Sequence, residues 1–260
     1  MSNKDPILEL RGVSKSFGAV QALYQVDFHV APGEVMALVG DNGAGKSTLI
    51  KCIAGIHPFD EGEILFEGKP VHIHGPKDAA NLGIEVVYQD LALCDNLDVV
   101  QNMFLGREEV ATLRRLDETT MEKRATDTLA TLSVTTIRSV RQTVAGLSGG
   151  QRQSVAVAKA VMWNSKVVVL DEPTAALGVA QTRQVLDLVK RLAEQGLAVV
   201  LISHNLHDIF EVADTITVLR LGQNVAEFKR TDVTQTQVVE AITAGALSKV
   251  PGHVQSEVVA

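Results

Sequence analysis

Short apolar runs, bounded by turn residues, recur along the chain and predict a set of buried strands. Continuous apolar runs of this length are typical of strands in a protein core. The runs are Val35–Val39, Val167–Leu170 and Ala198–Ile202, and a further strand is predicted at Ile84–Tyr88. Two more strands, Thr215–Arg220 and Val225–Phe228, are predicted on either side of a turn at Gly222.

The first part of the chain instead alternates apolar and polar positions, which predicts strands with one buried face. Within residues 7–30, one strand opens with Ile7, Leu8 and Leu10, and a second carries Leu23, Val26, Phe28 and Val30. A turn at Asp60–Gly62 leads into another strand at Glu63–Glu67. We therefore predict a small antiparallel sheet in this region.

Helical spacing replaces the strand patterns over residues 95–160. Apolar residues recur there at helical intervals, at Met121, Ala125, Leu129 and Leu132, so we predict a mostly helical insertion. An amphipathic helix ending at Gly196 and a last helix at Thr234–Ala244 are also expected. After Gly245 the periodicity is lost, and residues 246–260 are expected to form a flexible tail.

Composition and charge narrow the class of protein. The chain has 260 residues, of which 46% are hydrophobic and 21% charged, as in soluble globular proteins. A net charge of −7 argues against nucleic acid as a partner. The cysteines, Cys52 and Cys94, follow no metal or disulfide pattern. No apolar run approaches the length of about 18 residues that a membrane span needs, so any membrane role is expected to depend on a partner.

One glycine-rich segment carries the strongest chemical signal. It follows a buried strand, precedes a helix-forming run, and fits the phosphate-binding pattern Gly-x-x-x-x-Gly-Lys-Ser/Thr. Its residues are Gly40, Asp41, Asn42, Gly43, Ala44, Gly45, Lys46, Ser47 and Thr48. Glycines let backbone N–H groups point at an anion, and the helix N-terminus adds positive charge. Lys46 is expected to reach the β- and γ-phosphates of a nucleotide, and Ser47 to hold Mg²⁺.

Two further segments suit phosphate chemistry. Asp171 and Glu172 end a buried strand, which suits an aspartate that holds Mg²⁺ and a glutamate that polarises an attacking water. A carboxylate pair at the surface is the plainer alternative. A second anion site is predicted where a helix-forming run, Arg152–Trp163, follows Ser148, Gly149, Gly150 and Gln151. We hypothesise that this second site serves a nucleotide held by another copy of the chain.

In this order, the segments resemble the ATP-binding-cassette (ABC) ATPase family. The resemblance covers about residues 6–245 and rests on Gly40–Thr48, Gln89, Leu147–Gln151, Asp171–Glu172 and His204. It implies an α/β fold, in which a P-loop NTPase core has a mixed sheet flanked by helices, an antiparallel β subdomain and a helical subdomain. It also implies a single ABC ATPase domain over residues 1–245, with a core lobe at about 1–90 and 161–245 and a helical lobe at about 91–160.

The resemblance implies roles for the remaining site residues. Phe17 stands where the family has the aromatic residue that stacks on adenine, and a core phenylalanine is the alternative. Gln89 stands where a glutamine joins the lobes, touches Mg²⁺ and senses the transporter; a plain surface glutamine is the alternative. His204 stands where a histidine contacts the γ-phosphate. Glu172, His204 and Gln89 are thus the expected catalytic residues.

The family also implies an assembly. It binds two ATP molecules between two head-to-tail cassettes, so Ser148, Gly149 and Gly150 are expected to contact the γ-phosphate held by a second copy. Ser47, Gln89 and Asp171 are the expected ligands of Mg²⁺. One departure stands out, because Gly178 replaces an aspartate that the family often has after the catalytic glutamate. That change puts the contacts of this loop across the dimer in doubt.

Several segments are similar to one subgroup, the ribose-, xylose- and fructose-type sugar importers. They are Gly40–Gly43, Thr174–Val179, Ser203–Asn205 and Phe210–Asp214. We therefore expect an ATPase that powers sugar import at the cytoplasmic face of the membrane, with a permease and, indirectly, a sugar-binding protein as partners. An ABC transporter ATPase for amino acids or lipids is an alternative. A soluble ABC protein acting on ribosomes or DNA is another.

Overall fold

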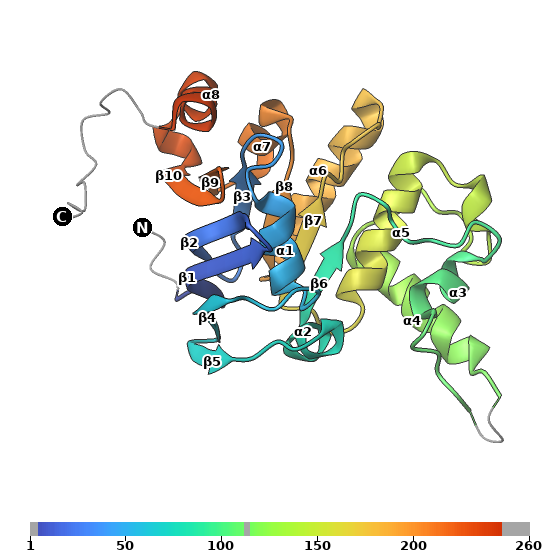
Figure 1. Ribbon diagram of the computed structural model, residues 1–260. Coiled ribbons are helices and arrows are strands. Elements are labelled where there is room, and N and C mark those ends of the chain that lie inside the picture. The colour runs from blue at the N-terminus through green and yellow to red at the C-terminus, as the bar shows by residue number, and fades with distance from the viewer. Residues whose placement is uncertain (1–4, 112–114, 246–260) are drawn as a thin grey trace, which may run out of the picture.

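The computed structural model describes residues 5–111 and 115–245 of the chain. These residues form a six-stranded sheet and a four-stranded sheet with helices packed around them (Figure 1). The predicted combination of a mixed sheet flanked by helices with an antiparallel sheet is confirmed. The predicted tail, residues 246–260, lies outside the described residues.

The larger sheet has the strand order β10-β9-β3-β8-β7-β6. Its strands are β3 (Val35–Val39), β6 (Ile84–Val87), β7 (Val167–Asp171), β8 (Ala198–Ile202), β9 (Thr215–Arg220) and β10 (Gln223–Lys229). Neighbouring strands run parallel, except that β10 is antiparallel to β9. Val167 and Val169 pack with residues of the helix after β3, and Val168 and Leu170 pack on the opposite face. Burial on both faces explains why β3, β8 and the first four residues of β7 have no polar positions.

The smaller sheet is antiparallel, with the order β2-β1-β4-β5. Its strands are β1 (Leu8–Phe17), β2 (Val20–Val30), β4 (Glu61–Phe66) and β5 (Lys69–Val71). The turn predicted at Asp60–Gly62 is wrong, because Glu61 and Gly62 belong to β4. Gly62 has a φ of +96°, and a Cβ there would lie 2.7 Å from the Arg11 and Gly12 carbonyl oxygens. This glycine therefore permits close approach of β4 to β1 and does not mark a turn.

Helices cover the sheets and form a separate layer at one end. The helices next to the sheets are α1 (Lys46–Ile53), α2 (Pro76–Leu82), α6 (Val179–Glu194), α7 (Leu206–Val212) and α8 (Gln235–Ala244). The layer at the end consists of α3 (Val99–Phe104), α4 (Glu118–Thr131) and α5 (Gly149–Val161), which pack on one another. Figure 1 shows this green and yellow layer beyond β6. The lobe boundaries near residues 90 and 160 stay a prediction.

Residues 132–148 have no α-helix, although the whole insertion is predicted to be mostly helical. Polar contacts hold this stretch in place. Arg141 forms ion pairs with Glu122 at 2.9 Å, Glu118 at 3.2 Å and Asp98 at 3.5 Å. One side chain thus joins the loop to α4 and to the start of α3. The periodic positions Met121, Ala125, Leu129 and Leu132 are buried as predicted.

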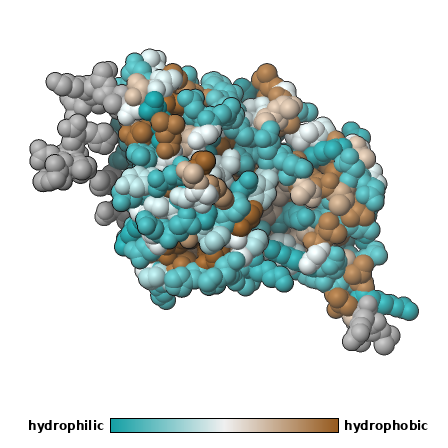
Figure 2. Space-filling view, viewed as in Figure 1, coloured by the Kyte–Doolittle hydropathy of each residue, from teal (hydrophilic) through white to brown (hydrophobic). Residues whose placement is uncertain are grey.

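The visible surface is mostly hydrophilic (Figure 2). Apolar side chains gather over the helical layer, where Leu105, Val110 and Leu116 are 43%, 59% and 55% exposed. Among the described residues, no helix combines the length and the apolar character that crossing a membrane requires.

We predict that Phe28 is a main stabilising residue of the core that joins the two sheets. It is 1% exposed and packs in the same cluster as Met36 and Leu38 of β3. Replacing it in Phe28→Ala should lower the free energy of unfolding by about 3–5 kcal/mol, measured by urea denaturation followed by circular dichroism. The control is Val20→Ala at the start of the same strand, β2, where the side chain is 67% exposed. It should change stability by about 0.5 kcal/mol or less. Equal losses in both variants would contradict this core assignment.

Candidate nucleotide-binding site

The register of the parallel sheet brings four loops to one edge. Ile202 of β8 lies opposite both Leu38 of β3 and Asp171 of β7, and Leu170 lies opposite Val87 of β6. The carboxyl ends of β3, β8, β7 and β6 therefore lie level with one another. The loops that follow these ends begin at Gly40, Ser203, Glu172 and Tyr88. In α/β proteins, ligands bind in the crevice outside such strand ends.

The phosphate loop depends on two glycines that other residues could not replace. Gly40 has a φ of +152°, and a Cβ there would lie 2.2 Å from the Leu219 carbonyl oxygen. Gly45 has a φ of +103°, and its Cβ would lie 2.9 Å from the Ala22 carbonyl oxygen. Gly45 also caps α1 without a side-chain hydrogen bond. The first N–H groups of α1 are therefore free of a side-chain cap, which suits an anion.

The side chain of Lys46 is held against the phosphate loop by hydrogen bonds to its backbone. Its Nζ donates hydrogen bonds to the Gly40 carbonyl oxygen at 2.6 Å and the Asp41 carbonyl oxygen at 3.0 Å. Burial lowers the pKa of Lys46, and the negative charges of Glu172, Asp171 and Asp41 oppose that shift. A phosphate would offer this ammonium group a charged partner in place of neutral carbonyls. Next to it, Ser47 is exposed and Thr48 is half-buried.

The two carboxylates lie at the end of β7, and β8 separates this strand from β3, which leads into the phosphate loop. Burial raises the pKa of Asp171, with Lys46 as the main opposing charge. Burial also raises the pKa of Glu172, and His204 opposes it most. Glu172 has a φ of +52°, which a residue other than glycine rarely adopts. Its N–H donates to the Ile202 carbonyl oxygen at 2.9 Å, and this bond helps to hold the strained conformation.

His204 lies beside Glu172. The distance from His204 Nε2 to Glu172 Oε1 is 3.0 Å, and the His204 backbone N–H donates to Glu172 Oε2 at 3.4 Å. Nevertheless, Oε1 is buried and accepts no hydrogen bond of good geometry from any described residue. A misaligned donor contributes little to a hydrogen bond, so the short distance between Nε2 and Oε1 does not satisfy this oxygen. An unsatisfied carboxylate oxygen is suited to accept a hydrogen bond from a water molecule.

Two other predicted residues are exposed. Phe17 ends β1 with 44% of its surface exposed, which excludes the core alternative. The ring of Phe17 lies edge-on to that of His57, at 5.1 Å between centroids, and Lys15 Nζ lies 5.5 Å from its centroid. One side of the ring is thus supported while part of it faces solvent. Gln89 is exposed and lies just beyond β6.

The segment Ser148–Gln151 starts α5, but the helix begins at Gly149 and not at the predicted Arg152. Ser148 and Gln151 form a capping box, in which Gln151 Oε1 accepts from the Ser148 N–H at 2.9 Å. The spacing Ser-x-x-Gln is a signal for this start that our sequence analysis missed. A Cβ on Gly149 would lie 2.8 Å from Leu177 Cδ2, so this end of α5 packs on the segment before α6.

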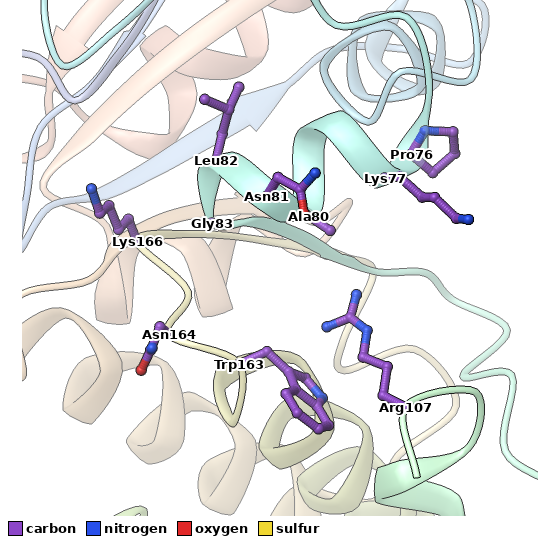
Figure 3. A pocket seen from close by; sticks show the side chains of 10 residues that line it. All are labelled: Pro76, Lys77, Ala80, Asn81, Leu82, Gly83, Arg107, Trp163, Asn164 and Lys166. Atoms are coloured by element: carbon purple, nitrogen blue, oxygen red, sulfur yellow. The ribbon is translucent and has the colours of Figure 1, made fainter. Parts of the chain in front are cut away.

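A groove that the sequence did not reveal separates the sheet from the helical layer. One part has a volume of about 320 Å³ and is lined by Tyr88 and Asp90, on either side of Gln89, and by Trp163. An adjoining part of about 690 Å³ lies between α2 and the end of α5 (Figure 3). Arg107 lines both parts, 5.3 Å from the Trp163 ring centroid. These side chains come from segments far apart in the sequence, so no local motif marks them.

Comparison with known proteins identifies the family. The sequence profile of the family described as "ABC transporter" matches residues 23–175, and these include the phosphate loop and both carboxylates. The chain belongs to the ABC transporter family. It is 48% identical to the fructose import ATP-binding protein FrcA of Rhizobium meliloti, over 92% of this chain and 95% of that protein. It is 47% identical to the xylose/arabinose import ATP-binding protein XylG of Sulfolobus acidocaldarius, over 94% and 96% of the two chains.

A solved structure extends the similarity to three dimensions. It is a dimeric ABC-family cassette in a post-hydrolysis state, bound to ADP and Pi. Its TM-score against this protein is 0.71 at 26% sequence identity, and the match covers 86% of this chain and 98% of that one. The α/β P-loop NTPase fold expected for this ABC-family chain is thereby confirmed.

The raised pKa values of Asp171 and Glu172 predict that this ABC-family site costs stability. A carboxyl group whose pKa is raised by folding destabilises the native state above that pKa, and the penalty disappears as the pH falls below the unfolded value of about 4. Asp171→Asn and Glu172→Gln should therefore raise the midpoint of thermal unfolding at pH 7 in the nucleotide-free protein. The gain should shrink as the pH approaches 4. Differential scanning calorimetry at several pH values measures this difference.

Glu194→Gln, at the exposed C-terminal end of α6, is the control for loss of a negative charge. It should leave the midpoint nearly unchanged across the same pH range. A lower midpoint at pH 7 in both site variants would show that these carboxylates stabilise the native state.

Proposed function

We propose that this chain is the ATP-hydrolysing subunit of a membrane importer for a simple sugar, acting at the cytoplasmic face of the membrane. One observation carries the proposal: identities of 48% and 47% with a fructose and a xylose/arabinose import ATP-binding protein, over nearly the whole length of all three chains. Membership of the family makes the chain an ABC-type ATPase that binds nucleotide. The assignment of a simple sugar as the transported substrate goes beyond family membership and is the part that we propose.

The phosphates of ATP are bound by the loop after β3 in this proposal. Gly40 and Gly45 leave room for the backbone to approach an anion, and Lys46 supplies a positive charge that is already poised in the loop. Phe17 offers an exposed aromatic face for adenine. These features support binding of the phosphates at one end of the site and of the base at the other.

Glu172 is the proposed catalytic base. Its buried Oε1 is free of a well-aligned hydrogen bond, so it can accept one from the water that attacks the γ-phosphate. Its raised pKa makes it a stronger base than an exposed glutamate. His204 lies 3.0 Å from it, and in this proposal it contacts the γ-phosphate while Gln89 reports the state of the transporter.

The donor set also suits a magnesium ion. Ser47, Asp171 and Gln89 would hold it, because hydroxyl, carboxylate and amide oxygens are the ligands that Mg²⁺ prefers. Asp171 lies at the end of the strand and burial already raises its pKa, so a cation would offset the cost of ionising it. When bound, Mg²⁺ neutralises charge on the phosphate oxygens.

A second copy of the chain is proposed to complete each site. The start of α5 packs on Leu177 before α6, and Ser148 and Gly149 remain exposed. In the proposed head-to-tail dimer, Ser148, Gly149, Gly150 and Gln151 contact the nucleotide of the partner copy. The dimeric form of a cassette with a TM-score of 0.71 supports this arrangement.

The groove beside Gln89 is the proposed docking site for the membrane permease. It lies between the sheet and the helical layer, and its lining combines apolar Met103 and Leu105 with charged Asp90 and Arg107. A change in the position of Gln89 on ATP binding would therefore reach the permease directly. A sugar-binding protein on the other side of the membrane is the proposed source of the sugar.

Replacing the proposed base tests the mechanism. We expect Glu172→Gln to reduce ATP turnover by at least about 100-fold, because the amide cannot accept the proton of the attacking water. ATP binding should persist, and an ATP-bound dimer should accumulate. Phosphate release and size-exclusion chromatography with ATP measure the two effects. Glu194→Gln is the control and should turn over ATP at the wild-type rate. Wild-type turnover by Glu172→Gln would rule out this role for Glu172.

The chemical class of the transported substrate is tested with the assembled transporter. We expect the chain to co-purify from detergent-solubilised membranes with a permease and, when reconstituted in vesicles with the sugar-binding protein, to show several-fold higher ATP turnover with one simple sugar. Fructose, xylose, arabinose and ribose are the sugars to test, and an amino acid mixture is the control. Stimulation by amino acids alone would refute sugar import and leave the ATPase assignment intact.

A further inference from the structure

A buried carboxylate outside the proposed catalytic set links the two loops that carry Glu172 and His204. Asp208 lies in α7 and is 2% exposed. Its Oδ2 accepts a hydrogen bond from Thr174 Oγ1 at 2.7 Å, and its Oδ1 accepts one from Asn205 Nδ2 at 2.9 Å. Each carboxylate oxygen of Asp208 is therefore bonded to a different loop of the site.

The two donors stand next to the residues that matter for hydrolysis. Thr174 follows Glu172 by two residues, and the Ala175 N–H donates to the Glu172 carbonyl oxygen at 3.1 Å, so this turn is closed on itself. Asn205 directly follows His204 and also caps α7, because its Oδ1 accepts from the His207 N–H at 3.0 Å. A displacement of either donor would thus move a neighbouring site residue.

Physical chemistry favours a positioning role for this arrangement. A buried carboxylate is costly unless hydrogen bonds satisfy it, and hydrogen bonds to an ionised acceptor are about twice as strong as neutral ones. Asp208 therefore holds Thr174 and Asn205 firmly at a fixed separation. No hydrogen bond from a described residue holds Oε1 of Glu172. The position of the Glu172 side chain relative to His204 therefore depends on the backbone of the two loops.

We propose that Asp208 is a positioning residue that fixes the loop of Glu172 against the loop of His204 through Thr174 and Asn205. The proposal rests on the catalytic roles proposed above for Glu172 and His204. Asp208 itself does not reach the reacting atoms. Its network sets the separation of the two residues, which lies at 3.0 Å in this structure. The Thr174 hydroxyl is accordingly required for fast hydrolysis, although it binds neither nucleotide nor metal.

A matched pair of variants tests this role. Thr174→Val removes the hydroxyl and keeps the shape, whereas Thr174→Ser keeps the hydroxyl. We expect Thr174→Val to lower kcat about 10- to 100-fold, since misplacing a catalytic group by about 1 Å costs that much. The KM for ATP should stay within about twofold of wild type, and Thr174→Ser should restore most of the rate. Thr126→Val is the control, because its hydroxyl bonds only within α4, to the Glu122 carbonyl oxygen at 2.8 Å.

A double-mutant cycle with Asp208→Asn adds a second test. If Thr174 acts through Asp208, the double variant should be no slower than the slower single variant. Wild-type kcat in Thr174→Val, or equal losses in Thr174→Val and Thr174→Ser, would overturn the proposal. Glu172→Gln is assayed in parallel: if it is inactive while Thr174→Val is fully active, only the positioning role fails. Wild-type turnover by Glu172→Gln would instead rule out the catalytic role of Glu172 on which this proposal rests, and would leave the family assignment intact.

Discussion

The level register of β3, β8, β7 and β6 is the constraint on which the rest of the molecule depends. Because Ile202 pairs with both Leu38 and Asp171, the loops of three separate strands open at the same edge. This register is enforced by burial on both faces, since a slip by one residue would exchange the packing partners of every side chain. The strand interiors are therefore mostly apolar, and the chemistry lies at the ends of the strands and in the residues that follow them. Local sequence can encode such a site only as short motifs placed after buried runs.

This separation of apolar strands from short chemical motifs explains which features the sequence could predict. The phosphate loop is local, and its glycines are required at Gly40 and Gly45 by the backbone, so the pattern was visible. The central strands of the larger sheet, β3, β7 and β8, were visible because each contains a short apolar run. The seven-residue helix α2 was missed because it buries only Ala79 and has no periodicity, although Pro76 and Gly83 mark its ends. Gly62 was misassigned because a glycine in a turn and one at a close strand contact look alike in sequence.

The contacts between the motifs could not be predicted from the sequence, because they form between segments that are far apart in the chain. Asp208 and Thr174 are separated by 34 positions and meet only because β7 and β8 are neighbours. The groove residues Arg107 and Trp163 likewise come together through packing of the helical layer. The resulting site is unfavourable for the stability of the fold. Glu172 has a strained backbone conformation, and burial raises the pKa values of Asp171 and Glu172. Sites of this kind give up stability for activity.

The packing around Trp163 gives the protein an internal optical probe. Trp163 is the only tryptophan in the chain, and the guanidinium groups of Arg107 and Arg124 lie 5.3 Å and 4.9 Å from its ring centroid. Indole emission is sensitive to nearby charge and to water. Because Trp163 lines the groove, a segment that enters the groove changes the water and the charge around the indole. The unlabelled protein can therefore report occupation of the groove by its own fluorescence, in real time and without introducing a cysteine or a dye.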